Sequence, residues 1–407
     1  METNCDICVI GSGAIGKASA LALAREGYRV TLLGPEIEGP KAAEAADGSW
    51  DLRVFALNHV AHALLSSLRV WDAMDASRIA PVDAMAVQGD DAGVGQLGFD
   101  AYSARVGALA WIVEERNLTQ ALDDALRFAT GVKQVQGRAA ALSCGADHAE
   151  VTLADGSRLT ASLVVSADGA NSWVRTQADI GMDYRSYDQR GVVANFSCTQ
   201  AHYGVASQWF LGADGIVALL PLPGNQVSLV WSAPEALADK LLSESAEHLC
   251  ARLAALPDQK LGQFSLLPPA KPTAFPLRLI RSHSLAAHRI ALVGDAAHVV
   301  HPLAGHGMNL GFGDIDALVA ALKTHAQSGD CGNEQMLARY ARSRKEEVLL
   351  MQFATDGLHR LFSTELAPVK FLRNAGMRVV DKLPFLKQRL MAHAFGRTLS
   401  STSSERS

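Results

Sequence analysis

Residues 289–313 read RIALVGDAAHVVHPLAGHGMNLGFG, and this stretch joins a short apolar run to a loop rich in Gly and His. The apolar run from Ile290 to Val293 predicts a buried strand. Apolar residues at helical spacing follow the loop and predict one face of a helix: Ile315, Leu318, Val319 and Leu322. Because α/β folds hold ligands between a strand end and a helix start, the loop predicts a binding site.

Glycines crowd this loop, at Gly305, Gly307, Gly311 and Gly313. Glycine has no Cβ, so the backbone can turn tightly there or press against a flat ring. If the helix opens at Met308 and Asn309, its N-terminal amides favour a ligand that carries negative charge. The alternative is a Gly-rich turn after a core strand. The candidate binding residues in this stretch are Gly294, Asp295, Pro302, Gly305, Gly307, Met308 and Asn309.

The N-terminal residues also predict a strand, a glycine turn and a helix. Residues 7–10 predict the strand, a helix runs to about Glu26, and a second strand spans residues 28–33. The turn between them, Gly11-Ser12-Gly13-Ala14-Ile15-Gly16, gives GxGxxG, which in this context is a dinucleotide fingerprint with a pyrophosphate on the helix N-terminus. Gly34 stands where an acidic residue usually contacts the ribose, so Glu36 or Glu38 is expected to reach back instead.

Composition excludes several other classes of protein. A chain of 407 residues is long for one domain, so two packed domains are expected. A formal charge of −5 provides no general attraction to nucleic acid. No apolar run approaches the roughly 20 residues of a membrane-spanning helix. The start METNCDICVI does not resemble a signal peptide, so the expected location is the cytoplasm.

Six cysteines are scattered along the chain and are expected to be thiols in a reducing compartment. Cys5 and Cys8 form a CxxC, but it leads into a strand and no second pair follows. This context favours core packing over a zinc or redox site, and no metal is expected.

The middle of the chain is rich in predicted strands. Residues 163–167 predict a buried strand that ends at Asp168-Gly169, and residues 111–128 predict a helix. Residues 189–288 read as strands interrupted by one helix at about 234–256. The predicted fold class is α/β with three parts. These are a discontinuous nucleotide-binding domain at 1–80, 100–182 and 285–330, an inserted β-sheet substrate domain at 81–99 and 183–284, and a C-terminal helical segment at 331–400.

GxGxxG, Asp168-Gly169 and Gly294-Asp295, in that order, resemble the class A flavoprotein aromatic hydroxylases, which share the fold of para-hydroxybenzoate hydroxylase. Further stretches resemble the ubiquinone-biosynthesis hydroxylases of the UbiH/UbiF/VisC type, and the resemblance covers nearly the whole chain. They are RVFAL at 53–57, ALAWIVEERNL at 108–118, VVSADGANSWVR at 164–175, ALLPLPGNQVSLVW at 218–231, GDAAHVVHPLAGHGMNLGFGDIDAL at 294–318, TDGLHRLF at 355–362 and LPFLKQRLMAHAFG at 383–396. His306 and Met308 depart from the Gln and Leu-like residues that are frequent in this family.

The resemblance implies a binding site for FAD. Gly11, Gly13 and Gly16 would hold the pyrophosphate, and Asp295 would hydrogen-bond the ribitol or ribose. Asp168-Gly169 would shape the same site and the approach of a reduced nicotinamide. Arg53 and Arg116 would contact the cofactor, and residues 302–309 would lie along the isoalloxazine. No residue is identified as an obligatory acid or base, although His298, His301 and His306 are candidates.

The implied reaction is hydroxylation of the ring of a polyprenylated phenol, through a flavin C4a-hydroperoxide, with O₂ as co-substrate and NAD(P)H or another reductant as electron donor. The alternatives are a hydroxylase of a small soluble phenol, resembling salicylate or hydroxybenzoate, and a non-catalytic flavin-binding scaffold of the biosynthetic complex. Between Arg339 and Arg397 the chain has 12 Lys or Arg and 5 Asp or Glu, interleaved with apolar residues. This cationic pattern predicts peripheral contact with the inner membrane or with other ubiquinone-biosynthesis proteins. The alternative is an ordinary solvated helix face.

Overall fold

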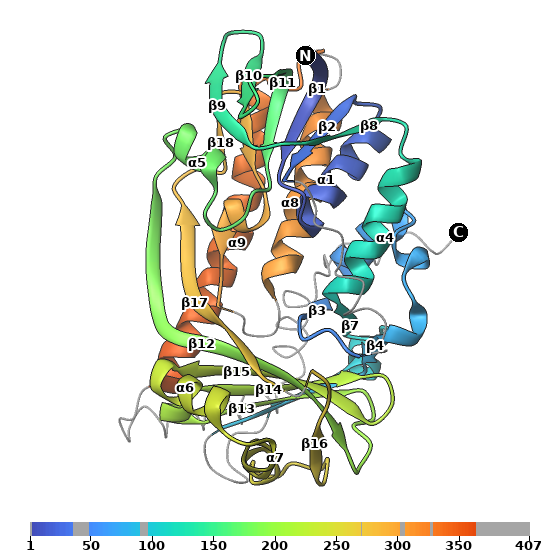
Figure 1. Cartoon of the computed structure of the whole chain (residues 1–407), viewed down its shortest axis with the longest axis vertical. Helices are drawn as coiled ribbons and strands as arrows, with labels where there is room; N and C mark the ends of the chain where they lie inside the picture. Colours follow the sequence, from blue (N-terminus) through green and yellow to red (C-terminus); the bar gives the residue numbers. More distant parts are fainter. Residues whose placement is uncertain are drawn as a thin grey trace, which may run out of the picture.

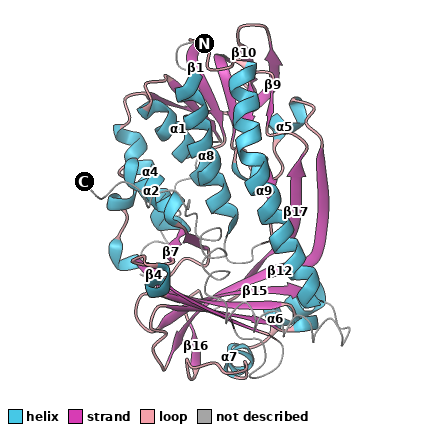
Figure 2. Cartoon of the chain, turned by 180° about the vertical axis from the view of Figure 1, so that it is seen from behind, coloured by secondary structure: helices cyan, strands magenta, loops and turns pink. Residues whose placement is uncertain are grey.

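The structure is a computed structural model that describes residues 2–35, 49–89, 97–269, 271–301, 306–325 and 329–363. Within these ranges the chain forms three sheets, with helices packed against two of them (Figures 1 and 2). No helix in the described part of the chain is long and apolar enough to cross a membrane. Glu36, Pro302 and Gly305, and the C-terminal segment from residue 364, lie outside the described residues.

An eight-stranded sheet contains the glycine turn of the N-terminus. Its five parallel strands, in spatial order, are β8 (Val132–Gln136), β2 (Val30–Gly34), β1 (Glu2–Ile10), β11 (Arg158–Ser166) and β19 (Ile290–Leu292). Antiparallel strands extend it: β18 (Ala286–Ala287), β10 (Ala149–Leu153) and β9 (Ala139–Cys144). The strands predicted at residues 7–10, 28–33, 163–167 and 290–293 are therefore confirmed. Cys5 and Cys8 are buried free thiols in the core of this sheet, as predicted.

Six helices of the described ranges contribute buried residues to the core around this sheet. They are α1 (Ala14–Arg25), α2 (His59–Ser67), α4 (Glu115–Phe128), α5 (Trp173–Gln177), α8 (His306–His325) and α9 (Glu334–Ser363). In α4 the buried residues follow helical spacing: Leu118, Ala121, Leu122 and Leu126. The prediction of a helix over all of residues 111–128 was wrong at its start. Ile112 lies in strand β7 (Ala110–Glu114), because two neighbouring strands pair with this apolar run from both sides.

A small three-stranded sheet lies between the two large sheets (Figure 1). In the three-stranded sheet β7 is central, with β3 (Val54–Leu57) and β4 (Ile79–Val82) antiparallel to it on either side. Short helical elements complete the description: η1 (Trp71–Ala73), η2 (Ala76–Arg78), α3 (Ala101–Ala104), η3 (Gly212–Asp214) and η4 (Gly294–Ala296).

The second large sheet has nine strands. They are β20 (His298–Val299), β17 (Thr273–Ser282), β12 (Met182–Cys198), β15 (Gln226–Pro234), β14 (Ile216–Leu222), β13 (Val205–Phe210), β5 (Ala84–Gln88), β6 (Leu97–Asp100) and β16 (Phe264–Leu266). The long strands β12 and β17 run from the first sheet toward the second (Figure 1). β5 and β6 pair antiparallel at the edge of this sheet, whereas Pro81 and Val82 pair with β7 in the small sheet. The division into domains stays a prediction.

Two helices pack on one face of the nine-stranded sheet, α6 (Glu235–Ser243) and α7 (Ala246–Ala254). The single helix predicted at 234–256 was wrong, because the chain breaks at Glu244 and Ser245, where the Ser245 side chain caps α7. Side chains alternate along a strand, so Val217 and Leu229 bury against these helices while Ala218 and Val230 face the other way. The free face of the sheet therefore looks toward the first sheet and the loop after β19.

Candidate functional site

A cavity of about 430 Å³ lies where the glycine turns meet the free face of the nine-stranded sheet. Residues predicted as binding residues from far apart in the sequence share its wall: Gly13, Ala14, Ile15, Arg53, Gly169, Asp295, Gly307, Met308 and Asn309. The opposite wall comes from the sheet and is mostly apolar. It includes Met85, Val193, Ala206, Ile216, Ala218, Leu220, Val230 and Phe275. The cavity thus has one wall rich in backbone amides and one apolar wall.

Two glycines of the GxGxxG turn lie where neighbouring backbone leaves no space for a side chain, and the third faces open space. A Cβ at Gly11, whose φ is +115°, would lie 2.2 Å from the Ala167 carbonyl oxygen. A Cβ at Gly16 would lie 1.8 Å from the Gly11 carbonyl oxygen. A Cβ at Gly13 meets nothing within 4 Å. Gly13 is also the N-cap of α1 without a side-chain cap, so the first amides of this helix are available to an anion at the cavity wall.

Gly34, the departure from the dinucleotide fingerprint, also has a packing reason. A Cβ at this position would lie 2.4 Å from both Cβ and Oγ of Ser12. Ser12 therefore occupies the space that a side chain at the end of β2 would need. The prediction that Glu36 reaches the ribose concerns a residue outside the described ranges.

Asp295 lies at the start of the loop after β19, with its side chain open to the cavity. Protein atoms around the Asp295 carboxyl reduce its contact with solvent. This desolvation raises the pKa of Asp295 above its ordinary value. The positive charges of Arg53 and Arg278, and the nearby His298, act in the opposite direction. The preceding Gly294 has a φ of +61°, which a glycine adopts without strain. A carboxyl that opens into the cavity is suited to hydrogen-bond a ligand hydroxyl.

Beneath this loop lies a buried charge cluster centred on Asp314 of α8. Asp314 accepts from the backbone N–H of Gly294 at 2.9 Å, lies 2.7 Å from Nε2 of His298, and accepts from Nε of Arg344 at 2.8 Å. Burial opposes ionisation of Asp314, yet His298 and Arg344 together hold its pKa below the ordinary value. Tyr340 of α9 donates to the Leu292 carbonyl at 2.6 Å. The cluster and this hydrogen bond lock α8 and α9 to the end of β19.

The three histidines considered as catalysts have different places. His298 is buried against Asp314 and is not part of the cavity wall. His301 is also buried, with Nε2 at 3.3 Å from Oε1 of Gln189 and its ring edge on Tyr187. His306 begins α8, and its side chain lies outside the description. Neither His298 nor His301 lines the cavity, and a catalytic role for any of the three histidines stays a prediction.

Asp168 caps a helix, whereas its neighbour Gly169 lines the cavity. The Asp168 carboxylate accepts from the backbone N–H of Trp173 at 2.8 Å and of Val174 at 3.1 Å, and from the hydroxyl of Ser166 at 2.6 Å. These bonds satisfy the first amides of α5. Asp168 is not on the cavity wall, so it shapes the site through the backbone that carries Gly169.

Of the two arginines predicted to contact the cofactor, Arg53 lines the cavity and Arg116 does not. Arg53 forms an ion pair with Glu115 at 3.0 Å, and Glu115 lines the cavity as well. Burial raises the pKa of Glu115, an effect that Arg53 opposes and Asp51 reinforces. The guanidinium of Arg116 instead donates to the Ser49 carbonyl at 2.6 Å. Contact of Arg116 with a cofactor stays a prediction.

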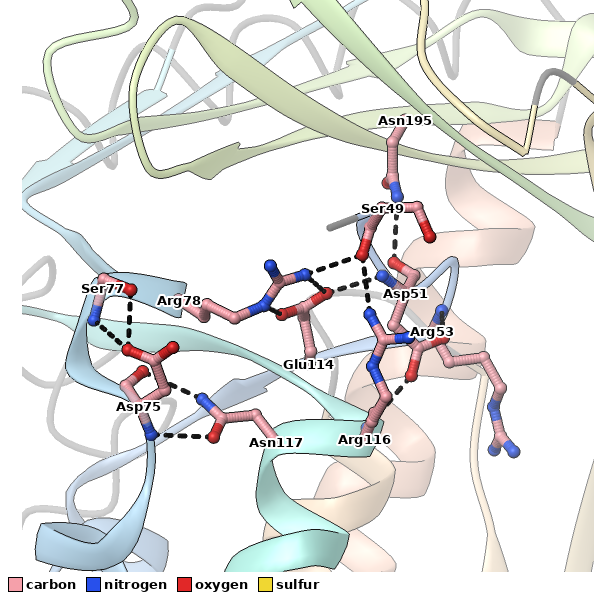
Figure 3. Close-up of polar contacts among 10 residues, drawn as sticks. All are labelled: Ser49, Asp51, Arg53, Asp75, Ser77, Arg78, Glu114, Arg116, Asn117 and Asn195. Atoms are coloured by element: carbon pink, nitrogen blue, oxygen red, sulfur yellow. Dashed lines mark hydrogen bonds and ion pairs between the residues drawn. The ribbon is translucent and has the colours of Figure 1, made fainter. Parts of the chain in front are cut away.

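A network of polar contacts fixes the segment from Ser49 to Arg53 (Figure 3). Glu114 is 1% exposed, accepts two hydrogen bonds from Arg78, and accepts from the Asp51 N–H at 2.6 Å. The Ser49 carbonyl also accepts from Arg78, at 2.9 Å. Asn195, on strand β12, donates to the Asp51 carbonyl at 2.9 Å. We call this network, made of Ser49, Asp51, Arg78, Glu114, Arg116 and Asn195, the 49–53 clamp.

Among the described residues, no group of three or more His, Cys, Asp or Glu is arranged to hold a metal ion.

Comparison with known proteins identifies the group that this wall of amides fits. A family described as FAD binding domain matches residues 4–352. The chain belongs to this FAD-binding family. It is 36% identical over 393 residues to the ubiquinone hydroxylase UbiL of Rhodospirillum rubrum, covering 96% of this chain and 89% of that protein. It is 34% identical to the 3-demethoxyubiquinol 3-hydroxylase of Escherichia coli, covering 96% of this chain and 98% of that protein.

The fold agrees with this family. The crystal structure of PqsL, a probable FAD-dependent monooxygenase from Pseudomonas aeruginosa, superposes with a TM-score of 0.73 at 23% identity, covering 93% of this chain and all of that one. The predicted class, α/β in the para-hydroxybenzoate hydroxylase arrangement, is confirmed. So is the resemblance to the ubiquinone-biosynthesis flavoprotein hydroxylases.

The residues present fit FAD. The open space at Gly13 and the uncapped start of α1 would accept the pyrophosphate, because a side chain at Gly13 would fill that space. Asp295, whose side chain opens into the cavity, would hydrogen-bond a hydroxyl of the ribitol or ribose. Gly307, Met308 and Asn309 in the first turn of α8 line the same cavity, where a helix start favours an anionic ring edge. Asn309 is itself held by the Asn58 N–H and the Ala56 carbonyl.

The sequence alone did not identify the residues that join the two walls. Glu115 and Asn58 line the cavity, and neither was predicted as a site residue. Gln208 and Phe275 enter it from the sheet, and nothing in their local sequence indicated this. Their role depends on which face of a strand points inward, which pairing between distant strands decides.

Proposed function

We propose that this FAD-dependent monooxygenase hydroxylates the aromatic ring of a polyprenylated phenol in ubiquinone biosynthesis. The names of the relatives support the pathway. The observation that carries the proposal is one cavity with two unlike walls: the amides and Asp295 on the cofactor side, and an apolar sheet face on the other. An apolar wall suits a ring with a hydrocarbon chain, because burial of apolar surface stabilises binding by about 25 cal/mol per Å².

FAD, when bound, supplies the redox chemistry that activates O₂ and transfers one oxygen atom to the ring. The chain supplies binding, orientation and exclusion of water. The start of α1 would bind the pyrophosphate of FAD, Asp295 would hydrogen-bond its ribitol or ribose, and the first turn of α8 would lie along its ring system. The 49–53 clamp holds the segment that carries Leu52 and Arg53, both of which line the cavity. The apolar sheet face keeps water away from the reacting atoms.

The electron donor and the place of reaction are further parts of this proposal. NAD(P)H is the proposed reductant. The substrate class resides in a bilayer, so the protein is proposed to bind the inner membrane peripherally. The surplus of basic residues between Arg339 and Arg397 supports this contact, since each Lys or Arg near an anionic surface contributes about 1 kcal/mol.

The test is an assay of the FAD-loaded protein with NADPH and NADH, and with two sets of phenols. One set carries prenyl chains and the other consists of small phenols such as salicylate. The expected result is consumption of reductant coupled to a prenylated product that has gained one oxygen atom, detected by mass spectrometry. Hydroxylation of small phenols alone would identify the soluble-phenol alternative. Reduced protein that reacts with O₂ but hydroxylates neither set would contradict the proposal and favour the scaffold.

A further inference from the structure

Four residues on the free face of the nine-stranded sheet form one row across the floor of the cavity. Gln208 on β13 pairs with Ala218 on β14, Ala218 pairs with Val230 on β15, and Val230 pairs with Val193 on β12. All four line the cavity. Directly paired residues on one face have neighbouring side chains. Gln208 is thus a polar group at the end of an apolar row, and the small Ala218 beside it leaves space above the sheet.

The Gln208 amide has no hydrogen-bond partner among the described residues, although the residue is only 9% exposed. The nearby side-chain amides of Asn195 and Asn309 each form at least one hydrogen bond. The Asn195 amide nitrogen donates to the Asp51 carbonyl, and Asn309 bonds both Asn58 and Ala56. A buried amide without a partner costs free energy, so such groups in folded proteins usually have a partner, whether protein, water or ligand. The available partner for Gln208 is whatever fills the cavity.

We infer that Gln208 determines specificity by hydrogen bonding an oxygen substituent of the substrate ring. This inference rests on the proposed function. A side-chain amide accepts through its carbonyl oxygen and donates through its nitrogen. It therefore matches a phenol hydroxyl, which donates and accepts, and a ring methoxy oxygen, which accepts. The adjacent Ala218, Val230 and Val193 offer only apolar contact, so Gln208 fixes which edge of the ring faces the sheet.

The experiment compares two ligands that differ only in the oxygen. Binding of 2-geranylphenol and of geranylbenzene to the FAD-loaded protein is measured by the change in the flavin absorption spectrum, without turnover. The variant is Gln208→Met, which keeps the length of the side chain and removes its hydrogen bonds. The control is Gln200→Met, at an exposed position after the end of β12. Thermal unfolding of each variant verifies that the fold is retained.

The wild type and Gln200→Met are expected to prefer the phenol, and Gln208→Met is expected to lose about three- to tenfold of that preference. The affinity of this variant for geranylbenzene should be unchanged or stronger. Geranylbenzene offers no hydrogen bond to the Gln208 amide, and the variant no longer buries that amide without a partner. If Gln208→Met retains the full preference, the inference falls while the proposed function stands. If the wild type binds neither ligand, the proposed function fails and this inference with it.

Discussion

Glycines of the N-terminal turn have two different roles: Gly16 allows close backbone packing, and Gly13 leaves space for the cofactor proposed to bind there. Single substitutions can distinguish the two roles. In Gly16→Ala the new Cβ would lie 1.8 Å from the Gly11 carbonyl oxygen, so the turn must deform. In Gly13→Ala the new Cβ meets no protein atom but projects into the space proposed for the pyrophosphate. Gly16→Ala is expected to lower both the unfolding temperature and FAD affinity. Gly13→Ala should lower FAD affinity alone. Thermal unfolding and FAD titration measure the two effects.

The control is Gly107→Ala, because a Cβ at Gly107 also meets nothing within 4 Å and this residue is not on the cavity wall. It should leave both quantities unchanged. Normal FAD affinity in Gly13→Ala would contradict the assignment of the pyrophosphate to the start of α1.

Asp295 is expected to have opposite effects on stability and on cofactor binding. Its folded-state pKa is raised by desolvation, so the stability it contributes is full at low pH and is lost as pH rises through that pKa. In the FAD-free protein Asp295→Asn should therefore be stabilising at about pH 8, and the gain should disappear toward about pH 4. In the same variant FAD should bind about tenfold to a hundredfold more weakly, as expected when a charged hydrogen bond is lost.

Urea unfolding at both pH values and FAD titration measure these effects, with the exposed Asp72→Asn as control. An unchanged FAD dissociation constant would show that the Asp295 carboxylate does not contact the cofactor. A pH-independent gain in stability would exclude desolvation as the cause of the raised pKa.

At the scale of secondary-structure elements, the 49–53 clamp joins three parts of the chain. Glu114 ends β7, Arg78 ends η2, and Asn195 lies in β12 of the large sheet. Glu114→Gln removes the charge that faces Arg78, and loss of one partner of a buried ion pair costs about 3 kcal/mol. The variant should unfold at lower denaturant concentration. FAD should also bind more weakly, because Leu52 and Arg53 line the cavity.

A matched control breaks an exposed ion pair. Asp124→Asn removes the partner of Arg127, and both side chains are largely exposed. Its effect should stay within about 1 kcal/mol. A similar small effect for Glu114→Gln would mean that the clamp does not hold the segment.

At the scale of the whole molecule, charge is distributed unevenly along the chain. The full chain has a formal charge of −5, whereas residues 339–397 contain 12 Lys or Arg against 5 Asp or Glu. Full-length protein is expected to co-sediment with anionic phosphatidylserine vesicles in a salt-sensitive manner. Truncation after Arg360 should weaken this binding and leave FAD in place. Neutral phosphatidylcholine vesicles are the control. Equal binding of the full-length and truncated proteins, or binding that does not change with salt concentration, would contradict the membrane proposal.

The sequence by itself determined the cofactor half of this protein. GxGxxG after a strand, and Gly294-Asp295 after another, are local patterns, because a tight turn between strand and helix depends on the few residues that form it. The α/β class and the strands β1, β2, β11 and β19 follow from such patterns. The sequence showed that Gly34 departs from the dinucleotide-binding pattern but could not explain it. The explanation is the Ser12 side chain, which occupies the space that a side chain at position 34 would need.

Only the tertiary structure decided the other half of the site. The local sequence predicted a helix at Ile112, but strands β3 and β4 pair with its segment and make it part of strand β7. Asp168 caps α5 while its neighbour Gly169 lines the cavity, and Gln208 reaches the cavity without any local signal. The physical reason is that strand pairing selects the inward face of a sheet, and a shift by one residue would turn each side chain to the opposite face. Contacts between residues hundreds of positions apart fix that choice.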